Sequence, residues 1–116
     1  MLWFEDRYKD VIKTGGENVA SLEVERALYE SEPRIKEVAV VGLPHDRWVE
    51  AITAVVIAKP GVTLTEQEVL DAAATRLPGF KRPKSVLLVD DMPRTATGKV
   101  QKNVIRNEHS DLYSTS

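Results

Sequence analysis

The sequence predicts an α+β fold: a small N-terminal β-hairpin followed by a compact α-β-β-α-β unit, a three-stranded sheet packed with helices. β-Branched residues are concentrated in two runs, 38–41 and 52–57, and glycine and proline bound both, which is typical of buried strands. A capping-box pattern at 65–68 predicts a helix start. The length of 116 residues suits one domain.

The first twenty residues predict the hairpin. A short apolar run at 2–4 and a second at 11–12 read as strands, and the pair Gly15–Gly16 supplies a tight turn. Ser21 is a residue type that caps helices, so a helix is expected to begin there and to end near Ser31, before a proline.

The second half of the chain predicts the remaining elements. The helix that begins at Thr65 should stop at Pro78–Gly79, and a third core strand should occupy 86–89. A polar loop then leads to a weaker helical stretch at 103–107. The tail, 110–116, is expected to fray.

Composition narrows the function classes. The 16 Lys and Arg residues against 18 Asp and Glu give a net charge of −2, so no global basic field indicates a nucleic-acid partner. Cysteine is absent, which excludes disulfides and thiolate sites and favours a cytoplasmic location. The longest apolar run, 54–58, is far shorter than the roughly 20 residues of a membrane span.

The loop 93–102 holds the strongest candidate for chemistry. Gly98 permits backbone conformations that other residues avoid, and Lys99 follows it as a cation at a loop tip, where it could reach a phosphate. The segment is not a P-loop, because Pro93 replaces the first glycine and Val100 replaces the Ser or Thr. From chemistry alone, a merely solvated lysine is the simpler interpretation.

A second candidate is the basic run 80–84, in which Arg82 and Lys84 could hold phosphates and Phe80 offers a ring face. A solvated strand edge is the plainer alternative. Trp48 either covers the core or presents an indole on which a purine could stack.

Other constellations are weaker. Gly15–Gly16 could let a ligand chain pass close to the backbone, or could form only a hairpin turn. His45 and His109 have no neighbours at metal-ligand spacing, so no metal site is assigned. No acid–base pair or Ser/His/Asp set can be argued either.

Several motifs, taken together, resemble the adenylate-forming (AMP-binding) superfamily, which includes fatty-acid and aryl-carboxylate CoA ligases (acyl-CoA synthetases). In order and spacing the chain is similar to the C-terminal lid domain of these enzymes from Trp3 to about Arg106. The motifs are Asp6-Arg7-Tyr8-Lys9-Asp10-Val11-Ile12-Lys13, Gly15-Gly16-Glu17-Asn18-Val19, Glu23-Val24-Glu25, Asp46-Arg47-Trp48, Phe80-Lys81-Arg82-Pro83-Lys84 and Pro93-Arg94-Thr95-Ala96-Thr97-Gly98-Lys99.

The resemblance implies a role for individual residues. Lys99 matches the lysine that serves adenylation of a carboxylate, Lys9 matches the hinge on which the lid rotates, and Arg7 matches a contact to the adenylate. Gly15 and Gly16 would line the pantetheine tunnel.

The resemblance also implies a CoA site and a division of the chain. Trp48, Phe80, Arg82 and Lys84 match positions that hold the CoA nucleotide in some members. Residues 1–10 would be the end of a linker with the hinge, 11–109 the lid domain, and 110–116 the frayed tail.

The implied partners are the N-terminal adenylation domain of the same enzyme, ATP, CoA and a carboxylic acid, with Mg²⁺ bound alongside ATP outside this chain. The family's phosphate loop and ribose motif do not occur in the sequence, so the isolated chain is expected to be inactive. Two alternatives stay open: the lid of an enzyme that loads a carrier protein, and a freestanding nucleotide- or nucleic-acid-binding module.

Overall fold

The computed structural model describes residues 11–45, 49–110 and 112. The elements run in the order β1 (Val11–Thr14), β2 (Glu17–Ala20), α2 (Ser21–Ser31), β3 (Ile35–His45), β4 (Val49–Ala58), α3 (Glu66–Ala74), the 3₁₀ turn η1 (Gly79–Lys81), β5 (Ser85–Leu88) and α4 (Lys102–Glu108). This order confirms the predicted α+β class. The expected strand at 2–4 lies outside the described residues, as does most of the tail.

The hairpin is formed by β1 and β2. Thr14 pairs with Glu17, which leaves a two-residue loop. Gly15 and Gly16 both have positive φ, at 58° and 87°. Two successive residues of positive φ are what the favoured two-residue hairpin turn requires, and glycine adopts that conformation without strain.

The predicted hairpin and the three predicted strands β3, β4 and β5 are joined in one five-stranded sheet, so the sheet has two more strands than the sequence predicted. β3 and β4 pair antiparallel over nearly their whole length. β1 joins one end of β4 through Thr14 and Val49, and β5 runs parallel to β4 farther along. β3 is therefore an edge strand.

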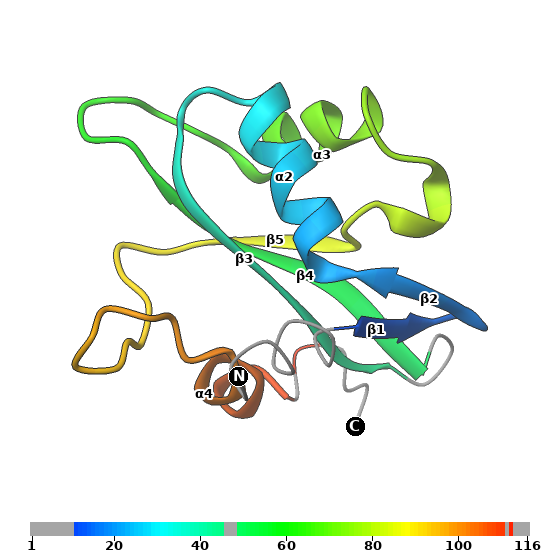
Figure 1. The fold of residues 1–116 in the computed structure, drawn as a ribbon. Helices are drawn as coiled ribbons and strands as arrows, with labels where there is room; N and C mark the ends of the chain where they lie inside the picture. The colour runs from blue at the N-terminus through cyan, green and yellow to red at the C-terminus, as the bar shows by residue number, and fades with distance from the viewer. Residues whose placement is uncertain (1–10, 46–48, 111, 113–116) are drawn as a thin grey trace.

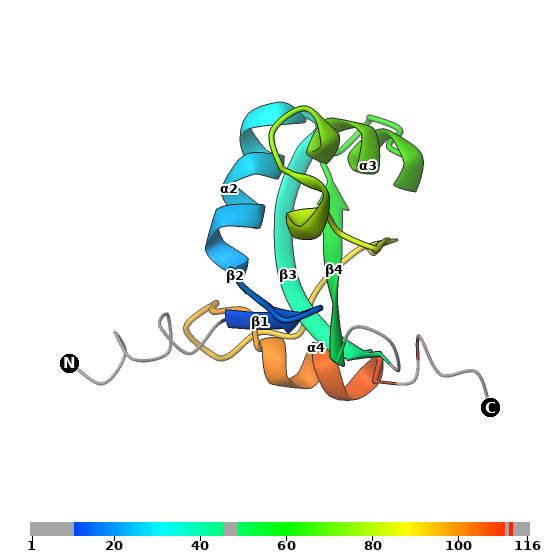
Figure 2. The same ribbon diagram turned by 90° about the vertical axis from the view of Figure 1, so that its right-hand side faces the viewer.

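Each face of the sheet carries its own apolar core. α2 and α3 cover one face and α4 the other, as Figure 1 and Figure 2 show from two sides. The continuous apolar runs of β3 and β4 explain this, because successive side chains of a strand point to opposite faces. Val40 and Val56 thus lie in the larger core, and Val41 and Val55 in the smaller one with Ile105 of α4.

The helix starts differ from one another. The predicted capping box at α3 is confirmed: Thr65 Oγ1 accepts from the Glu68 backbone N–H at 3.2 Å, and the Glu68 carboxylate accepts from the Thr65 N–H at 3.0 Å. The prediction that Ser21 caps α2 is wrong, because Ala20 occupies the cap position and makes no side-chain bond. Ser21 is the first helical residue, and its buried hydroxyl accepts from the Lys102 ammonium instead.

Within residues 11–45, 49–110 and 112, none of the helices has the length and apolar character needed to cross a membrane.

Candidate functional site

The loop that carries Lys99 is a small closed hairpin between β5 and α4. Arg94 and Val100 form an antiparallel bridge, and the Gln101 N–H donates to the Pro93 carbonyl at 2.9 Å. At the tip, the Thr95 N–H donates to the Lys99 carbonyl at 2.8 Å. This pattern leaves three residues in the loop, as in hairpins that place a glycine in the left-handed position.

Gly98 is that glycine, with a φ of 89°. Its N–H donates to the Thr95 carbonyl at 2.9 Å, which closes the turn. The hydroxyls of Thr95 and Thr97 lie 2.9 Å apart, and the Lys99 N–H donates to Thr95 Oγ1 at 3.3 Å. The sequence analysis did not predict that the threonine hydroxyls bond within the turn, although hydroxyl residues beside a turn glycine are a recognisable signal of such bonding.

The tip is exposed from Thr95 to Lys99, so the Lys99 side chain starts from a surface position on an internally bonded loop. Below the tip, Arg94 pairs with Glu37, and the hydrogen bond to that carboxylate raises the pKa of Arg94 above its ordinary value. An ammonium on such a loop can approach an anion brought up from outside the domain, since the backbone that carries it is already ordered.

The basic run 80–84 divides into exposed and structural residues. Phe80 is 44% exposed, and the Lys81 ammonium lies 5.6 Å from its ring centroid while pairing with Glu23 at 2.7 Å. Arg82 instead donates from Nε to the Leu77 carbonyl at 2.8 Å, beyond the end of α3. Cations stabilise the C-terminal end of a helix, where carbonyl groups lack helical partners. Arg82 therefore stabilises the end of α3, a role that its sequence context did not predict.

The remaining predicted residues have different surroundings. The Lys84 backbone N–H donates to the Ile52 carbonyl at 2.7 Å, which leads the chain into β5. A side chain added at Gly16 would meet open space, so the positive φ of the turn is sufficient to explain this glycine. Arg7, Lys9 and Trp48 lie outside the described residues.

The structure separates the predicted residues into two groups. In Figure 1 the Lys99 loop, drawn in orange, lies at the left, whereas the turn between β1 and β2 lies at the right, below the yellow-green η1 segment with Phe80. The loop with the adenylation candidate therefore lies at the opposite end of the domain from the Gly15–Gly16 turn and η1, the described segments of the candidate CoA site.

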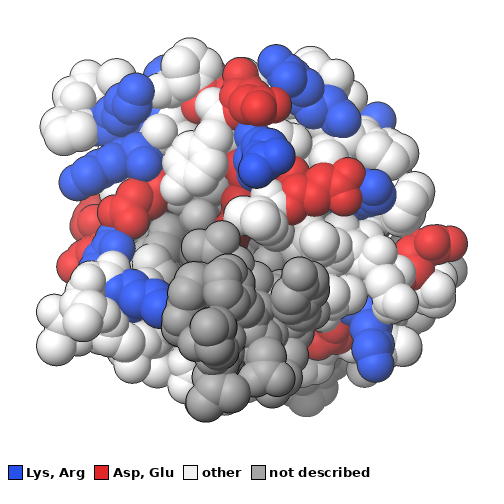
Figure 3. All heavy atoms as spheres, viewed as in Figure 1, with Lys and Arg blue, Asp and Glu red and all other residues white. Residues whose placement is uncertain are grey.

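The described part of the face seen in Figure 1 carries both signs of charge. Outside the grey atoms, Figure 3 shows Lys and Arg interspersed with Asp and Glu. In the described part of the chain, no three His, Cys, Asp or Glu side chains are grouped as a metal ion would require.

Known proteins match this chain over nearly its whole length. The chain is 48% identical over 103 residues to 4-hydroxybutyrate–CoA ligase 2 of Metallosphaera sedula, and the match covers 89% of this chain and 18% of that protein. It is 40% identical over 109 residues to long-chain-fatty-acid–CoA ligase FadD13 of Mycobacterium tuberculosis, covering 94% of this chain and 21% of that protein. The chain thus spans about a fifth of the length of the curated relatives it matches.

Solved structures agree in fold. ATP-bound MatB from Rhodopseudomonas palustris superposes with a TM-score of 0.87 at 43% identity, over 92% of this chain and 21% of that one. A Mycobacterium tuberculosis fatty acyl CoA synthetase gives a TM-score of 0.82 at 39% identity, over 90% and 20%. Residues 23–99 match the family described as "AMP-binding enzyme C-terminal domain". Since that match covers most of the chain, the protein belongs to the family of AMP-binding enzyme C-terminal domains.

Proposed function

We propose that residues 11–109 are the lid domain of an ATP-dependent acyl-CoA synthetase, with a hinge in 1–10 and a tail at 110–116. Membership of the AMP-binding C-terminal family supports this, as do relatives that are named CoA ligases. The partners would be the N-terminal domain of the same enzyme, a carboxylic acid, CoA, and ATP with its Mg²⁺. The enzyme would act in the cytoplasm.

The observation that carries the proposal is Lys99 on an exposed, internally bonded loop. When a carboxylate attacks the α-phosphate of ATP, two anions approach each other and negative charge builds up between them. A positioned ammonium offsets this repulsion most strongly in the transition state. Lys99 would supply that ammonium to a site in the N-terminal domain.

The separation of the two candidate groups supports a lid that works in two poses. If Lys99 faces the N-terminal domain during adenylation, the opposite end of the lid faces away from it. Rotation about Lys9 would then bring the Gly15–Gly16 turn to the site for the thioester step. Arg7 would contact the adenylate.

The CoA nucleotide would lie against Trp48, Phe80, Arg82 and Lys84. Phe80 is half exposed and available for stacking. The guanidinium of Arg82 has five N–H donors, which exceeds what the end of α3 uses, so it can still contact a phosphate.

The test is a hybrid enzyme, in which this chain replaces the matched segment of the Metallosphaera ligase. ATP–pyrophosphate exchange with 4-hydroxybutyrate measures adenylation, and CoA transfer from supplied acyl-adenylate measures the second step. Lys99→Ala should slow adenylation by about 10²-fold, the loss typical of one preorganised charge-stabilising group, and largely spare the second step. Lys59→Ala, which removes another exposed lysine, is the control.

Several outcomes would contradict the proposal. If Lys99→Ala slows adenylation and CoA transfer equally, Lys99 has no specific role in adenylation. Exchange by the isolated chain above background would show that ATP binds here rather than in another domain. Transfer to a pantetheine-bearing carrier protein in preference to CoA would favour the carrier-loading alternative.

A further inference from the structure

The Lys99 loop has little apolar anchorage near its tip. Residues 95–99 are all exposed, and the first buried side chain before them is Met92. Val100 packs only at the border of the smaller core. Apolar contacts are non-directional, so they do not fix the angle at which a protruding hairpin leaves the sheet. Hydrogen bonds and ion pairs at the base of the hairpin must therefore fix that angle.

One such contact joins the first limb of the loop to β3. Arg94 Nη2 lies 2.5 Å from Glu37 Oε2, and both side chains are largely shielded from solvent, at 27% and 30% exposed. Arg94 Nε lies 3.6 Å from Asp91 Oδ1 as well. Glu37 lies where the β3–β4 register shifts. A guanidinium held by two carboxylates has a defined orientation, and the adjoining backbone follows it.

The second contact joins the other limb to α2. The Lys102 ammonium lies 2.8 Å from Glu25 Oε2, with the side chains 21% and 14% exposed. It also donates to the buried Ser21 hydroxyl at 3.2 Å. Glu25 Oε2 is itself fixed, because it accepts from the Val40 N–H of the edge strand β3 at 2.8 Å. The lysine therefore meets a preordered acceptor.

We propose that these two ion pairs set the position of Lys99, so that Arg94 and Lys102 are positioning residues for adenylation. The inference rests on the proposed function of Lys99. The pairs lie on either side of it in sequence and are anchored to the elements of the larger core, α2 and β3. Holding both limbs stops the hairpin from tilting, and displacement of a catalytic group by about 1 Å can cost on the order of 10²-fold in rate.

The first experiment uses the hybrid enzyme with isosteric changes that remove charge without removing volume. Glu37→Gln and Glu25→Gln should each lower kcat for adenylation about tenfold, and the double variant about a hundredfold. KM for ATP and for the acid should change little, and thioester formation from supplied adenylate should be spared. Glu30→Gln is the matched control, since Glu30 also lies on α2 and pairs with Arg76, but on an exposed surface.

The second experiment measures the loop position without any activity. The native chain has no cysteine, so Ala96→Cys at the tip and Leu22→Cys on α2 allow two spin labels to be attached selectively. Their distance distribution should broaden in the Glu25→Gln/Glu37→Gln variant and stay narrow with Glu30→Gln. Exchanging the residues of one pair, as Arg94→Glu with Glu37→Arg, should restore part of the adenylation rate.

The outcomes separate the two proposals. An unchanged distance distribution, or adenylation within twofold of the Glu30→Gln control while Lys99→Ala is strongly impaired, overturns the positioning role alone. If Lys99→Ala has no effect, the proposed function fails, and the label distances still decide whether the pairs hold the loop.

Discussion

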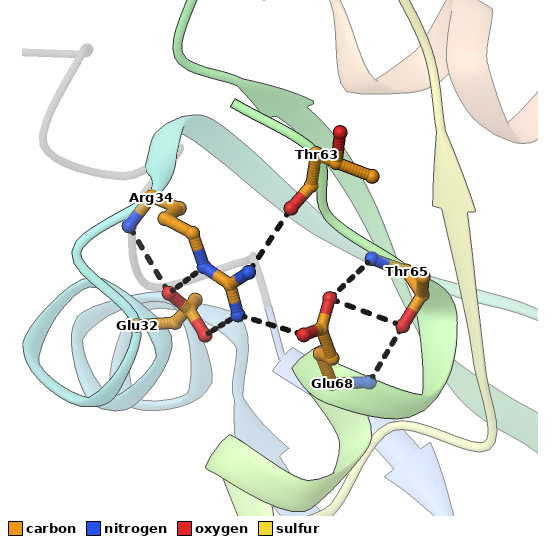
Figure 4. Close-up of polar contacts among 5 residues, drawn as sticks. All are labelled: Glu32, Arg34, Thr63, Thr65 and Glu68. Carbon is orange, nitrogen blue, oxygen red and sulfur yellow. Dashed lines mark hydrogen bonds and ion pairs between the residues drawn. The ribbon is translucent and has the colours of Figure 1, made fainter. Parts of the chain in front are cut away.

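The Arg34 guanidinium donates a hydrogen bond to each carboxylate oxygen of Glu32, from Nε to Oε1 at 2.9 Å and from Nη2 to Oε2 at 3.0 Å (Figure 4). The same guanidinium reaches Glu68 Oε2 at 3.2 Å and the Thr63 carbonyl at 3.0 Å. Glu68 belongs to the capping box of α3. This cluster therefore ties the turn between α2 and β3 to the start of α3, and it holds together the two helices that cover the larger core.

Arg34→Met should destabilise the chain more than Arg76→Met, whose ion pair with Glu30 is more exposed. The change leaves the buried Glu32 carboxylate without its bidentate partner, which is the costly way to break an ion pair. Urea unfolding of the two variants measures the difference. Equal losses would mean that the cluster acts as an ordinary surface pair.

The stabilisation by this cluster should depend on acid pH. The hydrogen bond from Arg34 lowers the pKa of Glu32 below its ordinary 4.5, against an opposing effect of burial. The Thr65 N–H and then Arg34 lower the pKa of Glu68. A depressed carboxyl pKa contributes stability above the unfolded value, and this is lost as pH falls through the folded value. The stability gap between wild type and Arg34→Met should therefore be full above pH 4.5 and shrink below it.

Gly42→Ala should destabilise the chain by about 1–3 kcal/mol, as overpacked cores do. A Cβ at this position would lie 2.9 Å from Ile12 Cγ2 and 3.1 Å from Glu50 Cδ, where the hairpin meets the long strands. Gly79→Ala is the control, because its Cβ would meet open space. If thermal unfolding shows the same loss of stability in both variants, the close contacts predicted for a Cβ at Gly42 do not occur.

Val49→Gly should stabilise the chain by about 1 kcal/mol. Among the described residues, Val49 is the one non-glycine residue with positive φ, at 69°, and it is 69% exposed. Relief of strain in a β-branched residue should outweigh the small burial lost. Val62→Gly provides the comparison, since Val62 is a partly exposed loop valine outside that conformation and should only lose stability.

Gly98→Ala and Gly61→Ala should cost similar stability, about 1 kcal/mol or somewhat more, because both glycines have positive φ and open space around them. In the hybrid enzyme, however, only Gly98→Ala should slow adenylation, since it distorts the turn that carries Lys99. Equal adenylation rates for the two variants would contradict the importance of loop geometry.

Lys9→Pro in the hybrid enzyme should leave adenylation active and block thioester formation. Proline fixes φ near −65° and restricts Tyr8, which removes the freedom that a hinge needs. Lys9→Ala controls for loss of charge. Single-turnover kinetics of each step provide the measurement, and identical behaviour of the two variants would place the hinge elsewhere.

The sequence alone determined the local features of this protein. The capping box at α3 depends only on Thr65 and Glu68, three residues apart, and the turn between β1 and β2 depends on two adjacent glycines. The strand runs were predictable because apolar β-branched residues favour a sheet buried on both faces. The motif around Lys99 was recognisable for the same reason, as its residues are contiguous.

The tertiary structure decided which distant residues meet. Glu37 and Arg94 are 57 positions apart, and nothing local marks either as the partner of the other. Ser21 has the chemistry of a helix cap, yet the arrival of Lys102 gives its hydroxyl another partner. The hairpin joined the sheet through Thr14 and Val49, and Arg82 turned to the end of α3. Local propensity fixes backbone conformation, whereas the pairing of side chains depends on the path of the whole chain, which brings their elements together only after folding.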